Sequence, residues 1–165
     1  MTKLINFLAK RDKSIKSVQI QFSLLAPDLG KQYQVKKICD ENNIDFLAYS
    51  PLSFGILCID PDKEEKKEKS FIRNVLFEKY KKPTYELRRC LKRIANQRSV
   101  SQAQVAINWC CYQGTIPLVG MRKKSQVIDI SNVFNWNLNK NEFEVLQEIS
   151  IKCLKKMPKN PFSSI

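Results

Sequence analysis

The sequence predicts an α/β protein with a parallel sheet, because short apolar strands alternate with helix-length amphipathic segments along its 165 residues. Apolar and polar residues alternate strictly in 17–23, and 44–50 is a mostly apolar run of the kind covered on both faces. The segment between them has helical spacing, so the three form a βαβ unit with parallel strands. A hydrophobic content of 43% is enough for one compact domain over 1–165.

The first half of the chain contains the clearest strand. Residues 2–12 carry an apolar stripe at helical spacing, which predicts an opening helix. The alternation in 17–23 places Gln19 on the polar face of a strand. A break at 27–30, with proline and glycine, then precedes a helix predicted over 31–43.

Charged residues dominate the middle of the chain. The run DPDKEEKKEK at 60–69 contains no residue that could enter a core, which predicts a solvated loop. Thr84 is a candidate cap for a helix whose apolar side faces the core. The rest of that helix carries cations, which we interpret as a solvated face: Arg88, Arg89, Lys92 and Arg93.

The last third of the chain predicts three helices and a strand. Ser101 and Gln104 match a capping box, in which each side chain bonds the other residue's backbone N–H, and the helix they begin would end at Gly114. Residues 115–120 then predict a short buried strand. Two more helices are expected, over 123–131 and from a cap at 139–142.

The net charge of +13 would attract polyanions. No nucleic-acid motif is present, however, and the aromatic residues do not alternate with the cations as in a stacking platform, which argues against nucleic acid as a partner. The first residues mix apolar and charged side chains, unlike a signal peptide or a membrane span, so no membrane association is expected.

Cysteine and histidine usage restricts both compartment and chemistry. The six cysteines show no CxxC spacing and there is no histidine, which predicts reduced thiols, no metal site and a cytoplasmic location. The absence of histidine also removes the commonest general acid and base. Any chemistry would have to use carboxylates, lysine, tyrosine or cysteine.

Five segments in the same order resemble the aldo-keto reductase family, in the branch of potassium-channel β subunits and plant-type reductases. They are VQIQFSLL, AYSPLSFG, QAQVAINW, IPLVGMR and NWNL, beginning at residues 18, 48, 102, 116 and 135. That family folds as a (β/α)8 barrel of roughly 250 residues. The resemblance therefore implies a partial TIM barrel, the C-terminal half, with these strands as the sixth to eighth.

The resemblance also implies a cradle for NADPH. Tyr49 matches the residue that stacks on the nicotinamide ring, and Gln19 matches the one that hydrogen-bonds its carboxamide. A flat ring and an amide suit these roles. The residues after Tyr49 match the lining of the pyrophosphate: Ser50, Pro51, Leu52, Ser53 and Phe54.

A second set matches the phosphate and adenine end of the cofactor. Gly120, Met121 and Arg122 lead into a helix N-terminus, where free amides favour an anion. By resemblance, Arg122 and Gln126 would hold the 2′-phosphate and adenine, which favours NADPH over NADH. Asp129 matches the acidic position that follows.

The chain departs from the family pattern at several positions. Ile59 and Asp60 replace a Gly-Lys pair near the pyrophosphate, and Ile130 replaces an asparagine near the adenine. A carboxylate at position 60 would repel phosphate. No segment resembles those that carry the catalytic Asp, Tyr, Lys and His, so no catalytic residue is assigned, and the chain alone is expected to be inactive.

Three functional hypotheses stay open at this point. The first is a half-barrel that acts on a carbonyl substrate only when the missing half is supplied. The second is a non-enzymatic basic binding module, and the third is a pseudo-enzyme that senses the cofactor. A half-barrel would also leave sheet edges unpaired, which predicts self-association.

Overall fold

A computed structural model of the chain describes residues 14–26, 31–63 and 71–157, together with Lys3, Phe7 and Lys10. Apart from those three single residues, the helix predicted over 2–12 lies outside the described residues. The break at 27–30 and residues 64–69 of the charged loop do so as well. Residues 60–63 form turns and loop, as predicted.

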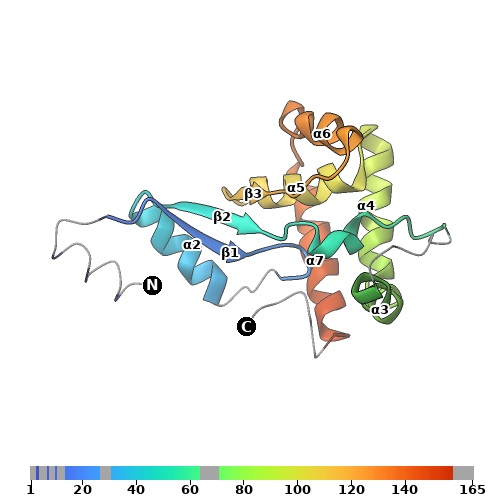
Figure 1. Cartoon of the computed structure of the whole chain (residues 1–165), viewed down its shortest axis with the longest axis horizontal. Helices are drawn as coiled ribbons and strands as arrows, with labels where there is room; N and C mark the ends of the chain where they lie inside the picture. Colours follow the sequence, from blue (N-terminus) through green and yellow to red (C-terminus); the bar gives the residue numbers. More distant parts are fainter. Residues whose placement is uncertain are drawn as a thin grey trace.

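The described strands form one parallel sheet in the order β1-β2-β3, which confirms the α/β class. The strands are β1 (Ser17–Gln21), β2 (Asp45–Tyr49) and β3 (Ile116–Leu118). Helix α2 (Lys31–Glu41) connects β1 to β2 and packs against β2. The arrowheads of β1 and β2 point toward the remaining helices, so the carboxyl ends of these strands meet the helical part of the molecule (Figure 1).

The helical part contains five α-helices and two 3-10 turns among the described residues. The α-helices are α3 (Phe71–Tyr80), α4 (Tyr85–Arg98), α5 (Gln102–Tyr112), α6 (Lys124–Ser131) and α7 (Lys140–Lys155). The 3-10 turns are η1 (Ser53–Cys58) and η2 (Val133–Asn135). Helix α3 is an element that the sequence pattern did not predict.

The two faces of the sheet differ in burial. The register places Val18 beside Phe46 on one face, where α2 and α5 pack against the sheet. On the other face, Leu47 lies beside Ile116, which is 46% exposed. The expectation that 115–120 is a buried strand is therefore wrong, because β3 has a partner strand on one side only within the described residues. The same open face leaves Leu47 partly exposed, so β2 is not covered on both faces.

Self-association is expected to follow from this open face and from the outer edges of β1 and β3, which have no second partner strand among the described residues. Light scattering of the purified chain should therefore give a mass above that of one chain. The substitution Ile116→Glu should shift the mass toward the monomer, because it places a charge on the open face next to Leu47. Val75→Glu is the matched control, since Val75 is a similarly exposed apolar residue, 49% exposed, on α3. A stable monomer with a cooperative melt would contradict the expectation.

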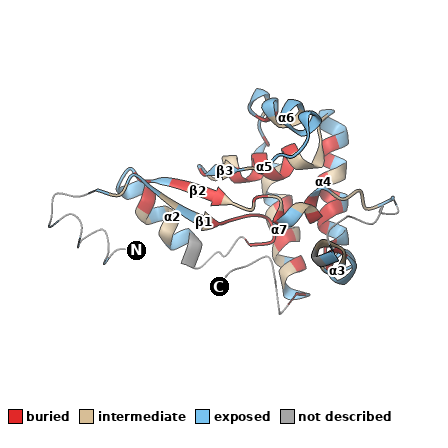
Figure 2. Cartoon of the chain, in the orientation of Figure 1, coloured by how far each residue is buried: buried red, intermediate tan, exposed pale blue. Residues whose placement is uncertain are grey.

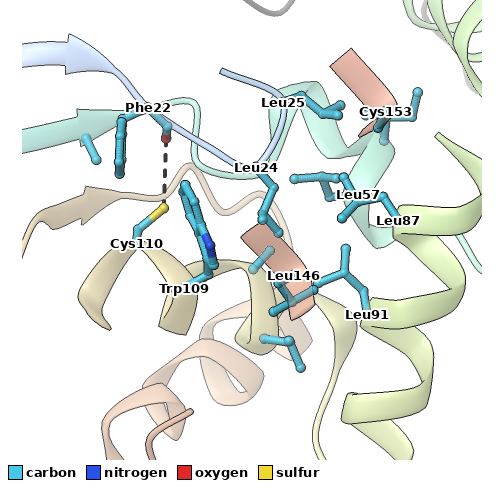
Figure 3. Close-up of a cluster of buried hydrophobic side chains, with 14 of the residues drawn as sticks. Phe22, Leu24, Leu25, Leu57, Leu87, Leu91, Trp109, Cys110, Leu146 and Cys153 are labelled. Atoms are coloured by element: carbon cyan, nitrogen blue, oxygen red, sulfur yellow. Dashed lines mark hydrogen bonds between the residues drawn. The ribbon is translucent and has the colours of Figure 1, made fainter. Parts of the chain in front are cut away.

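The hydrophobic core lies between the sheet and helices α4, α5 and α7. Figure 2 shows α5 mostly buried and α6 mostly exposed, and none of the residues of α6 is buried. Trp109 of α5 is fully buried and stacks on Phe22, with 5.3 Å between the ring centroids (Figure 3). The leucines of the same core come from several elements: Leu24, Leu57, Leu87, Leu91 and Leu146. Segments distant in sequence thus share one core.

The helix caps confirm some predictions and correct others. Asn139 and Glu142 form the complete capping box of α7, since each side chain accepts a hydrogen bond from the other residue's backbone N–H. Ser101 accepts from the backbone N–H of Gln104, as predicted, at 3.1 Å. Thr84 precedes α4 but does not cap it, because its hydroxyl donates backward to the carbonyl of Tyr80.

Candidate functional site

A cavity of about 850 Å³ lies at the carboxyl ends of β2 and β3. It brings together the loop that follows β2, the segment between β3 and α6, and helix α3. The lining residues include most of the predicted cradle, namely Ser50, Pro51, Leu52, Phe54, Gly120, Met121, Arg122 and Gln126. Segments about 70 residues apart therefore meet where parallel α/β proteins usually bind ligands.

The loop after β2 has an unusual backbone. Ser50, Ser53 and Phe54 have φ angles of 55°, 47° and 59°, in the left-handed region that costs free energy for residues with a side chain. Two short turns hold this conformation: the N–H of Ser53 donates to the carbonyl of Ser50, and that of Gly55 donates to the carbonyl of Leu52. Strain of this kind concentrates at binding and catalytic sites.

Side-chain hydrogen bonds hold the loop after β2 at both ends. The hydroxyls of Ser53 and Ser23 lie 2.8 Å apart and share a hydrogen bond, which joins the loop to the end of β1. Further along, the side-chain amide of Gln102 donates to the carbonyls of Leu57 and Ile59. Ser53 is fully buried and does not line the cavity, so among the predicted serines it is Ser50 that does.

Two backbone amides directly before α6 already have a hydrogen-bond partner. The side-chain oxygen of Gln126 accepts from the backbone N–H groups of Arg122 and Lys123, at 2.8 and 3.0 Å. Both amides lie at a helix N-terminus, where free amides would bind an anion. A phosphate could reach them only if the Gln126 amide rotated away, whereas the exposed Arg122 side chain can meet a phosphate directly.

Asp129 lies away from the cavity lining. Its carboxylate accepts from the hydroxyl of Ser101 at 2.6 Å and from the side-chain amide of Gln104 at 2.7 Å. The second half of the capping box predicted for Ser101 is therefore wrong, because the Gln104 side chain turns to α6 instead. Asp129 joins α6 to α5, and its predicted contact with adenine stays a prediction.

Gln19 and Tyr49 lie on the open face of the sheet, outside the cavity lining. The register pairs Gln19 with Leu47, so Gln19 and Tyr49 share this face and lie close in adjacent strands. Tyr49 is also paired with Leu118, which does line the cavity. The open face and the cavity are therefore continuous, and an extended ligand could contact both.

The acidic residue that departs from the family pattern is already paired. Lys92 of α4 donates to the Asp60 carboxylate at 2.6 Å, and the backbone N–H of Asp62 donates to it at 3.0 Å. These hydrogen bonds, that from Lys92 first, lower the pKa of Asp60 below its usual value. Asp60 lines the cavity as an ionised group, but Lys92 and the nearby Lys63 offset its charge.

Helix α4, the helix that was predicted to have a cationic solvated face, does not present a continuous cationic surface. Lys92 is paired with Asp60 and Asp62, and Arg98 makes two hydrogen bonds to Glu142, at 2.9 and 2.8 Å. Arg88, expected on the solvated face, is buried and donates to the carbonyls of Lys81 and Ile59. Burial of Arg88 corrects the sequence interpretation and leaves few cations of α4 for a polyanion.

Several lining residues were not predicted from the sequence, among them Lys63, Arg73 and Phe77. Arg73 and Phe77 belong to α3, which follows the charged run. An apolar stripe at helical spacing in 71–80 was the available signal, formed by Phe71, Val75 and Phe77 with Ile72 and Leu76.

Neither a metal centre nor a membrane segment is found in the described part of the chain. Within it, no three side chains of His, Cys, Asp or Glu lie close enough to share a metal ion. None of the described helices is both apolar and long enough to span a bilayer. All six cysteines are free thiols, as expected, and burial raises the pKa of Cys153 to about 11.

Comparisons with known proteins agree with the architecture. The model of the aldo/keto reductase family matches residues 1–151. The chain is 33% identical to the chloroplastic pyridoxal reductase of Arabidopsis thaliana over 165 residues, which covers 99% of this chain and 44% of that protein. It thus spans less than half the length of the curated relatives it matches.

Solved structures show the same fold. The glycerol dehydrogenase of Gluconobacter oxydans superposes with a TM-score of 0.67 at 21% identity, over 90% of this chain and 44% of that one. An aldo-keto reductase complexed with NADPH gives a TM-score of 0.60 at 15% identity, over 89% and 39% of the two chains. Because these proteins are TIM barrels, the predicted fold class, a partial (β/α)8 barrel, is confirmed.

Proposed function

This chain belongs to the aldo/keto reductase family, a family of oxidoreductases, and from that premise we propose that it is the NADPH-binding part of a carbonyl reductase. One observation carries the proposal. The two segments that resemble the family's cofactor cradle lie about 70 residues apart in sequence, yet both line one cavity at the carboxyl ends of β2 and β3. Segments with unrelated functions would not need to line the same cavity.

The cavity fits a dinucleotide phosphate in size and in chemistry. Its volume of about 850 Å³ falls within the range of sites for drug-sized ligands and cofactors. Its lining includes the cations Arg73 and Arg122, and the carboxylate of Asp60 is neutralised by Lys92. The open face beside the cavity adds Tyr49 and Gln19, whose side chains suit the ring and the carboxamide of nicotinamide.

Each part of the lining has a chemical role in this proposal. Arg122 would bind the 2′-phosphate through the planar fork of its guanidinium. The strained backbone at Ser50 would lie along the pyrophosphate, and Tyr49 would hold one face of the nicotinamide. When bound, NADPH supplies a hydride to a carbonyl carbon. The chain's own residues would orient the cofactor and shield one face of its ring.

We further propose that the chain by itself does not reduce carbonyls. The sequence has no histidine, and no tyrosine lines the cavity in the described residues. A proton donor for the carbonyl oxygen would have to come from further barrel units. With those supplied, an aldehyde is the substrate class we propose, as in the name of the related pyridoxal reductase. The six free thiols support a reducing compartment such as the cytoplasm.

Calorimetric titration of the chain with NADPH and with NADH tests the proposal. NADPH is expected to bind more tightly, and Arg122→Ala should weaken NADPH by about tenfold to a hundredfold, the effect of losing a charge-assisted phosphate contact. NADH should be little affected. Lys124→Ala is the matched control, because Lys124 is a cation of α6 that does not line the cavity.

The outcomes separate the candidate functions. Binding of NADPH without oxidation in the presence of pyridoxal supports a cofactor-binding part that lacks its proton donor. A chain that binds neither dinucleotide contradicts the proposal. Salt-sensitive binding of an arbitrary oligonucleotide, without dinucleotide binding, would favour the basic module instead.

A further inference from the structure

The acidic residue of α6 is already bonded inside the protein. Oδ2 of Asp129 accepts from the hydroxyl of Ser101 at 2.6 Å, and Oδ1 accepts from the side-chain amide of Gln104 at 2.7 Å. The same nitrogen of Gln104 also donates to the backbone carbonyl of Asp129 at 2.9 Å. Both carboxylate oxygens are therefore bonded to α5 and its N-cap, and Asp129 does not line the cavity.

Neighbouring groups fix the two residues that hold Asp129. Gln104 is buried at 4% exposure, and its side-chain oxygen accepts from the indole N–H of Trp136 at 3.1 Å. Both ends of this amide thus have partners, so it cannot reverse without losing them. Ser101 is held by its role as the cap of α5. Turning toward a ligand would cost Asp129 two charge-assisted hydrogen bonds.

The side chains that line the cavity offer little to the edge of a base. Among the described lining residues, the carboxylate and side-chain amide oxygens belong to Asp60 and Gln126. Asp60 is paired with Lys92, and the oxygen of Gln126 accepts from two backbone N–H groups, at 2.8 and 3.0 Å. Ile130, which follows Asp129, has no polar atom in its side chain. The amino group of adenine, a hydrogen-bond donor, would therefore find each of these side-chain oxygens already bonded.

The same end of the cavity does offer charge and an apolar surface. Arg122 is exposed and lines the cavity, so it can meet a phosphate directly. Met121 also lines the cavity and is 42% exposed. Its side chain can contact the face of a purine ring, and all purines have such a face. Recognition here would depend on the phosphate and the ring face, and not on the groups at the edge of the base.

We propose that the α6 end of the cavity binds a 2′-phosphorylated purine nucleotide without distinguishing adenine from hypoxanthine, and that Asp129 ties α6 to α5 instead of binding the base. This inference rests on the proposed cofactor site. It replaces the adenine contact that the resemblance implies for Asp129. Hypoxanthine has a carbonyl oxygen where adenine has its amino group, so a carboxylate that bound the amino group would reject hypoxanthine.

Titration calorimetry of the full chain with NADPH and with its hypoxanthine analogue, reduced nicotinamide hypoxanthine dinucleotide phosphate, tests the inference. The two Kd values should agree within about twofold, whereas a carboxylate contact with the amino group would separate them by about tenfold or more. Asp129→Ala should leave the ratio of the two Kd values unchanged. It should lower the melting temperature, because α6 loses its hydrogen bonds to α5. Arg122→Ala should weaken both ligands by the same factor.

Glu144→Ala is the matched control for the melting temperature. It removes a carboxylate of α7 whose ion pair with Lys140 is exposed, at 3.8 Å, so it should melt close to the unmodified chain. The ratio measured on the unmodified chain decides the inference even if Asp129→Ala does not fold. A preference for NADPH of about tenfold or more would overturn the inference and leave the proposed function standing. An unmodified chain that binds neither dinucleotide would overturn both.

Discussion

Replacing Trp109 with alanine is expected to lower the free energy of unfolding by about 3–5 kcal/mol, the range for deleting a large buried aromatic side chain. Trp109 is fully buried and stacked between two rings. The centroid distances are 5.3 Å to Phe22 and 6.2 Å to Phe143, with interplanar angles of 24° and 19°. Since Phe22 follows β1 and Phe143 belongs to α7, a cavity at Trp109 would loosen both the sheet and the last helix.

Urea denaturation followed by circular dichroism measures this effect, because the substitution removes a fluorophore. Trp109→Phe is the matched variant. It keeps an aromatic ring between Phe22 and Phe143 and removes an indole N–H that has no hydrogen-bond partner among the described residues. The decrease in the free energy of unfolding should therefore be clearly smaller for Trp109→Phe than for Trp109→Ala. A loss below about 1 kcal/mol for Trp109→Ala would be inconsistent with the buried stack.

Replacing Asn108 with alanine is expected to cost about 3 kcal/mol, because several buried groups would lose their partners at once. The Asn108 side chain donates to the carbonyls of Val133 and Trp136, at 3.1 and 2.9 Å. It also accepts from the backbone N–H of Leu138 at 3.0 Å. One amide on α5 thus holds the segment that leads into α7. Chemical denaturation of the variant gives the cost directly.

Asn108→Asp provides a control with a distinct pH dependence. Its carboxylate would be buried against two carbonyl oxygens, which should raise its pKa in the folded state above that in the unfolded state. The folded state then binds more protons, so this contribution to stability is fully present at low pH and is lost as the pH rises through the folded pKa. The deficit relative to the unmodified chain should therefore be smaller at acidic than at neutral pH. A deficit independent of pH would contradict the burial of this group.

The sequence by itself determined the local elements and the family. The strict alternation around Gln19 predicted β1, and helical spacing predicted α2, α4 and α5. These patterns are local, because strand and helix periods depend on neighbours a few residues away. The capping box at Asn139 was likewise predictable from four consecutive residues. Both segments of the candidate cradle were found from their motifs.

Only the tertiary structure decided which of these residues share one site. Ser53 turned inward to Ser23, Asp129 turned to α5, and Arg73 joined the cavity from a helix that no motif predicted. Hydrogen bonds across 25 or more positions set the directions of Ser53 and Asp129, and sequence spacing carries no information about them. The burial of β3 also depended on its neighbours in space, since β3 has one partner strand among the described residues and Ile116 stays 46% exposed whatever its own apolar pattern predicts.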